Sequence, residues 1–91
     1  MAPRAKILLL DERLAENAIL LRRHLLDLGE IDADLVLDLT ALNHMGAASL
    51  GVIAGYVRSH RRRGWECTYV VGDPSLYRLL TMTEAPVIMR D

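Results

Sequence analysis

Residues 33–53, ADLVLDLTALNHMGAASLGVI, contain the change from strand to helix on which the expected fold rests. Leu35, Leu37 and Leu39 share one side of an extended segment, as in a strand with one buried face. A short polar corner follows at Asn43 and His44, and a run of small residues then opens a helical segment. In α/β proteins such a corner is a common place for a phosphate, a nucleotide or a catalytic hydroxyl.

The same alternation of strand and helix patterns continues on both sides of this segment. Strands are predicted at 5–10, 33–39, 66–71 and 86–89, and helices at 14–29, 46–61 and about 74–82. The first helix has apolar residues in steps of four and three, at Leu14, Ala18, Leu21, Leu25 and Leu28. Gly29 is a natural stop for that helix, while Asp73 and Pro74 are typical first residues of the last one.

The order of these segments, β-α-β-α-β-α-β, predicts an α/β fold with a four-stranded, mostly parallel sheet. Strands covered on both faces are usually apolar throughout. Here polar residues occupy alternate strand positions, at Lys6, Asp38, Glu66 and Thr68. We therefore expect three or four helices that cover mainly one face. The 91 residues are enough for a single domain, taken as 1–91.

Composition narrows the class of protein. Hydrophobic residues make up 52% of the chain, which indicates a folded protein, and the net charge of −1 provides no general attraction to nucleic acid. Cys67 is the only cysteine, so an internal disulfide and a Cys-rich zinc site are excluded. The apolar runs are far shorter than the roughly 20 residues of a membrane helix, so no membrane insertion is expected. We predict a cytoplasmic protein.

The residues that carry chemistry in enzymes form no recognisable set. His24, His44 and His60 lie in three different segments without the spacing of metal ligands, so no metal site is predicted. Cys67 lies within a strand, which favours a buried, inert thiol. We therefore expect neither an enzyme nor a bound cofactor.

Two acidic residues and one basic run have structural interpretations that we favour. Asp38 and Asp73 lie near strand ends, where we expect the first to face solvent and the second to cap a helix. The segment GAASLG lacks the lysine of a phosphate-binding loop. The run RSHRRRGW, 58–65, is interpreted as a solvated helix end whose cations complement the helix dipole, with an acidic partner as the alternative.

Several longer segments together resemble the STAS domain, the fold of anti-sigma-factor antagonists and of the cytoplasmic tails of sulfate transporters. The resemblance extends from about residue 9 to about residue 86. It is carried by ERLAENAILLRRHLL (12–26), ADLVLDLTAL (33–42), GAASLGVI (46–53) and RRRGWECTYVVGDPSLYRLLTMT (61–83).

The resemblance explains the small residues of the corner. Family members usually carry Asp-Ser-Ser-Gly here, and a partner kinase phosphorylates the first serine, which disrupts the complex with the anti-sigma factor. This chain has Gly46 in place of the acid, Ala47 in place of the phosphorylated serine, Ala48 in place of the second serine and Ser49 in place of the glycine. Because alanine has no hydroxyl group, the usual switch cannot operate at this position.

What the resemblance implies is a non-catalytic regulatory module that binds an anti-sigma factor or a serine kinase-like protein. The predicted contact residues are Asn43, His44, Gly46, Ala47, Ser49 and Leu50. Two alternatives stay open. One is a small STAS subunit of a membrane transport complex for lipids or anions. The other is a phosphoswitch that uses Ser49 or Thr40.

The resemblance also raises an expectation about assembly. Family members usually have one more strand before the segment that matches 5–10, and only four residues precede it here. We therefore expect an uncovered edge at the strand Lys6–Leu10. Because exposed strand edges pair readily with other chains, a homodimer through this edge is a second expectation.

Overall fold

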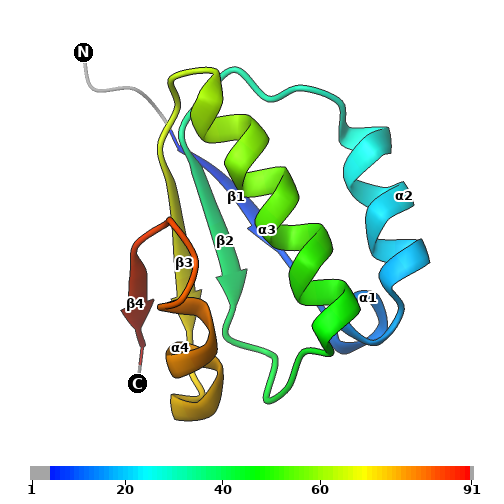
Figure 1. Cartoon of the computed structure of the whole chain (residues 1–91), viewed down its shortest axis with the longest axis vertical. Helices are drawn as coiled ribbons and strands as arrows, with labels where there is room; N and C mark the ends of the chain where they lie inside the picture. Colours follow the sequence, from blue (N-terminus) through cyan, green and yellow to red (C-terminus); the bar gives the residue numbers. More distant parts are fainter. Residues whose placement is uncertain (1–4, 91) are drawn as a thin grey trace.

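The computed structural model describes residues 5–90, which form one four-stranded sheet and four helices (Figure 1). In chain order the elements are β1 (Lys6–Leu9), α1 (Glu12–Glu16), α2 (Ala18–Leu28), β2 (Leu35–Leu39), α3 (Ala47–Arg62), β3 (Cys67–Val71), α4 (Pro74–Leu80) and β4 (Val87–Met89). The strands lie in the order β1-β2-β3-β4, and every neighbouring pair is parallel. The predicted α/β fold is confirmed, with a sheet that is parallel throughout.

The helices gather on one side of the sheet, as Figure 1 shows. Strands added in sequence order, each by a right-handed crossover, place successive helices on the same side. The burial of β2 reflects this arrangement, because Leu35, Leu37 and Leu39 are buried while Val36 and Asp38 are half-buried. On β1, Ile7 and Leu9 are each 68% exposed.

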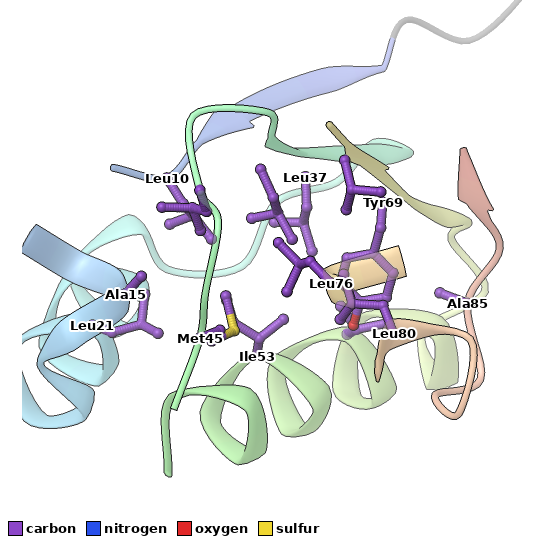
Figure 2. Packing of buried hydrophobic residues seen from close by; sticks show 14 of the residues in the cluster. Leu10, Ala15, Leu21, Leu37, Met45, Ile53, Tyr69, Leu76, Leu80 and Ala85 are labelled. Carbon is purple, nitrogen blue, oxygen red and sulfur yellow. The ribbon is translucent and has the colours of Figure 1, made fainter. Parts of the chain in front are cut away.

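The hydrophobic core lies between the helices and the sheet (Figure 2). It is almost entirely aliphatic, since the chain contains no phenylalanine. The largest fully buried side chain is that of Tyr69 on β3, which packs among leucines such as Leu37, Leu76 and Leu80. The apolar stripe predicted for the first helix supplies Leu21 and Leu25 to this core.

The first predicted helix differs from the observed structure, which has two helices where the periodicity predicted one. Asn17 separates α1 from α2 with an extended backbone, φ −128° and ψ 98°. Its side-chain oxygen accepts a hydrogen bond from the amide of Leu20 at 3.1 Å and so caps α2. Asp11 caps α1 in the same way, through the amide of Leu14 at 2.9 Å. An asparagine side chain that competes for backbone amides explains the break.

The ends of the other helices agree with the sequence signals. Asp73 caps α4, with its Oδ2 accepting hydrogen bonds from the amides of Ser75 and Leu76 at 3.0 and 3.1 Å, and Pro74 is the first helical residue. Gly29 follows α2 with a φ of +68°, a conformation that favours glycine. None of the helices within residues 5–90 is long and apolar enough to cross a membrane.

Candidate partner-binding surface

The corner between β2 and α3 is a loop that two buried side chains hold in place. Leu42 and Met45 are buried in the core, while Asn43 and His44 between them are exposed. Gly46 is the N-cap of α3 and has an extended backbone without a side-chain hydrogen bond. The first backbone amides of α3 therefore receive no hydrogen bond acceptor from the side chain of the N-cap residue.

The six residues predicted to contact a partner differ in exposure. Asn43, His44 and Ala47 are exposed, Gly46 and Leu50 are half-buried, and Ser49 is only 3% exposed. Ser49 lies on the inner face of α3 with Ile53 and Val57. The exposed surface of this first turn therefore consists of Ala47 and Ala48, while Ser49 is covered.

The hydroxyl of Thr40, the other predicted phosphorylation candidate, is already hydrogen-bonded. Thr40 Oγ1 donates to Asp38 Oδ1 at 2.6 Å, and the Thr40 amide donates to the same oxygen at 3.0 Å. Together with Arg90, whose Nη1 is 3.9 Å from Asp38 Oδ2, these bonds hold the pKa of Asp38 below its usual value. A phosphate on Thr40 would replace the donor and place more negative charge beside this carboxylate.

Asp38 is less exposed than expected. Its side chain lies on the side of β2 opposite the buried leucines and is 16% exposed, so it reaches solvent only in part. The reason is that the loop after β2 turns back and places the Thr40 hydroxyl and amide on the carboxylate. Like Asp11 and Asp73, Asp38 is bonded to a nearby backbone amide. All three acids at the carboxyl ends of β1, β2 and β3 therefore have structural partners.

The cysteine and the buried histidine are both enclosed within the fold. Cys67 is 2% exposed, and burial raises its pKa to about 11, so the thiol stays protonated at neutral pH. His60 is 2% exposed, with Nε2 2.7 Å from the carbonyl oxygen of Ala33, and its ring stacks on Trp65. Within residues 5–90, no group of three or more His, Cys, Asp and Glu residues could hold a metal ion.

Most of the basic run at the end of α3 is used within the molecule. Arg63 contacts the carboxylate of Asp32 at 2.8 Å, and Arg58 lies 3.8 Å from the carboxylate of Glu84. Arg61 donates a hydrogen bond to the backbone carbonyl of Glu84. These arginines attach α3 to the loops before β2 and before β4. The helix end is basic and Arg58, Arg61 and Arg62 are exposed, as expected, and three of its arginines also contact the two loops.

A groove between α2 and α3 was not foreseen from the sequence. Its volume is about 660 Å³, and its walls include Leu25 and Leu26 of α2 and Gly51, Gly55 and Tyr56 of α3. The signal available in the sequence was the pair of glycines one turn apart inside a predicted helix. The corner at 43–47 and this groove are thus the candidate binding surfaces of the described residues.

Comparison with protein families matches the STAS domain model to residues 5–89, nearly the whole chain. Comparisons with curated proteins and with solved structures found no match. The all-parallel sheet, the helices on one side and the corner before α3 agree with the family match. This chain therefore belongs to the STAS domain family.

Proposed function

We propose that this protein is a non-catalytic docking module of the anti-sigma-antagonist type, whose corner binds a partner protein without being phosphorylated. Membership of the STAS family supports a regulatory or transporter-associated module in general. The observation that carries the specific proposal is the exposed pair Ala47 and Ala48 at the first turn of α3. A partner meets two methyl groups there, and no oxygen that a kinase could esterify.

The corner has the features of a surface that binds protein. Asn43 and His44 offer hydrogen-bonding groups on a loop that Leu42 and Met45 hold in place. The small residues that follow allow a partner backbone to approach closely. Because the loop is already anchored, docking costs little ordering entropy, which favours affinity. We propose an anti-sigma factor or a serine kinase-like protein as the partner.

Two phosphoswitch variants have less support. A kinase would have to expose Ser49, which is 3% exposed, and at Thr40 it would have to break the 2.6 Å hydrogen bond to Asp38. The transport alternative, a subunit that accompanies a membrane ATPase, is distinguished from the first proposal only by the identity of the partner. It uses the same docking surface.

Affinity purification from the organism that makes the protein tests the proposal. Tagged wild-type chain, Ala47→Arg and Glu66→Arg are compared, because Glu66 is exposed at the opposite end of the sheet. We expect wild type and Glu66→Arg to retain an anti-sigma factor or serine kinase-like protein, identified by mass spectrometry, and Ala47→Arg to lose it. Recovery of a transport ATPase instead would select the alternative. Equal recovery with Ala47→Arg, or a phosphate on the purified chain, would overturn the proposal.

We also propose a homodimer through β1. The amides of Lys6 and Leu10 donate to carbonyls of Asp34 and Asp38, at 2.8 and 3.1 Å. By the alternation of a parallel ladder, the amide and carbonyl groups of Ile7 and Leu9 point to the outer edge. An antiparallel pair of β1 strands centred on Leu8 would place Ile7 opposite Leu9 of a second copy.

Light scattering after size-exclusion chromatography tests this pairing. We expect a concentration-dependent dimer for the wild type and a monomer for Ile7→Lys. Ile88→Lys on β4 is the matched control, because Ile88 is also an exposed apolar residue, on the opposite edge strand. A monomeric wild type at millimolar concentration, or a dimer that Ile88→Lys disrupts equally, would contradict the proposal.

A further inference from the structure

The solvent side of α3 is unusual for a surface helix. From Ala47 to Val57 it contains no charged residue, although Ala47, Ala48, Gly51 and Gly55 are exposed. A helix that faces only water ordinarily carries charged and polar side chains on that side. Charges begin only at Arg58, in the last turns of the helix. This composition indicates a surface that another molecule covers.

No close contact within residues 5–90 requires glycine at the two glycine positions inside α3. Gly51 and Gly55 lie one turn apart, both have ordinary negative φ angles, and a Cβ atom added at either position would meet nothing within 4 Å. Alanine is the better helix former and would fit at both positions. Because glycine has no Cβ atom, it lets the backbone of another molecule approach the surface of α3 more closely than alanine would.

The groove beside this glycine wall has the shape and surface of a helix-binding site. Its opposite wall on α2 contains Leu25 and Leu26, and the Leu26 side chain is 69% exposed. Along α3 the lining extends from Ala48 to His60, which at 1.5 Å per residue is about 18 Å, or a little over three helical turns. The volume of about 660 Å³ accommodates a row of apolar side chains.

Charge distinguishes the two ends of the groove. Arg63 lies at one end, where its guanidinium is balanced by Asp32 and Glu30 at 2.8 and 3.8 Å. Arg22 is the first residue that α2 contributes to the lining, and within residues 5–90 no carboxylate lies within 4 Å of it. The middle of the groove is therefore apolar, and Arg22 at one end has no carboxylate of residues 5–90 beside it.

We propose that the α2–α3 groove binds an amphipathic helix of a partner protein, about three turns long, with a carboxylate directed at Arg22. Its apolar side chains, spaced at i, i+4 and i+7, pack on Leu25, Leu26 and Tyr56, and its backbone crosses α3 at Gly51 and Gly55. The hydroxyl oxygen of Tyr56 is buried without a hydrogen-bond partner in the described part of the chain. The groove adjoins the corner at Ala48, and the proposed helix crosses α3 at Gly51 and Gly55 whether or not the corner docks a protein.

A displayed library of 16-residue, helix-favouring peptides is the probe. It is selected on the full chain, and enriched peptides are synthesised for titration by fluorescence anisotropy. We expect enrichment of amphipathic sequences with Glu or Asp at one end. Gly55→Gln should weaken binding of these peptides at least tenfold, because its side chain occupies the crossing point. Circular dichroism verifies that this variant is folded, which the open space at Gly55 leads us to expect.

Two neighbouring arginines provide the charge control. Arg22→Glu should lower the affinity for the acidic peptides at least fivefold and should favour peptides with Lys in place of Glu. Arg23 is one residue away and outside the lining, so Arg23→Glu should bind the peptides as the wild type does. Ala47→Gln at the corner should also leave peptide affinity unchanged. The proposal is overturned if no amphipathic peptide is enriched, if Gly55→Gln binds as tightly as the wild type, or if Arg22→Glu and Arg23→Glu have equal effects.

Discussion

The hydroxyl of Thr40 donates a 2.6 Å hydrogen bond to the carboxylate of Asp38, and the amide of Thr40 donates a second bond to the same oxygen. This pair closes the carboxyl end of β2 directly before the corner. Because Asp38 and Thr40 are hydrogen-bonded to each other, we assign both side chains a role in holding this part of the fold. The loop that carries Asn43 and His44 starts from a position that this pair holds.

The first prediction concerns this pair. Thr40→Val should destabilise the fold by about 1.5–3 kcal/mol at neutral pH, the usual range for a hydrogen bond to a charged group. The pKa of Asp38 is lowered in the fold from 3.8, so its stabilisation is present above that value and is lost as the pH falls through the folded pKa. Urea unfolding of Thr40→Val and the wild type at pH 7 and near pH 3 should therefore show a smaller difference in free energy of unfolding at the acidic pH.

Thr68→Val on β3 is the control for that experiment, because Thr68 is, like Thr40, half-buried but has no side-chain hydrogen bond among residues 5–90. It should change the free energy of unfolding by less than about 0.5 kcal/mol. Equal losses for the two threonine variants would show that the bond to Asp38 contributes little.

The second prediction compares two positions in the first turn of α3. Ser49→Asp places a charge at a position that is 3% exposed, and it should cost at least about 3 kcal/mol. Ala47→Asp is exposed at the start of the same helix and should be neutral or stabilising by up to about 1 kcal/mol, because a carboxylate complements the helix dipole there. Thermal melts distinguish the two. Similar melting temperatures would mean that Ser49 reaches the surface in solution.

The third prediction concerns the glycine wall of the groove. Gly51→Ala and Gly55→Ala should each raise the free energy of unfolding by about 0.5–1 kcal/mol, since alanine favours the helix and the added methyl group meets no neighbour. Chemical denaturation measures this gain. A destabilised Gly55→Ala would reveal a contact inside the chain that the open space does not provide.

The fourth prediction concerns alkaline pH. The pKa of Cys67 is about 11 in the fold against 9.0 for a free thiol, so the unfolded chain loses this proton first. The contribution of Cys67 to stability is fully present below pH 9 and declines as the pH rises from 9 to 11. The free energy of unfolding of Cys67→Ala, measured by chemical denaturation at several pH values, should therefore fall less between pH 9 and 11 than that of the wild type. An equal fall for the two proteins would contradict a raised pKa of the Cys67 thiol.

Much of the fold was predictable because its signals are local. The period-2 pattern of 33–39, the helix stop at Gly29 and the cap formed by Asp73 with Pro74 act within a few residues, and each has its expected structure. The break at Asn17 was missed because apolar periodicity continues across it from Leu14 to Leu21, while the hydrogen bond that interrupts the helix involves one side chain.

Other features depend on residues that are far apart in the chain. Arg63 is balanced by Asp32, which is 31 positions away, so the run of cations could not be assigned to loops before the fold was known. Likewise, only packing against the sheet buries Ser49 while leaving Ala47 and Ala48 exposed. The α2–α3 groove arises because two crossovers place their helices side by side on one face of the sheet, an arrangement that periodicity within either helix does not contain.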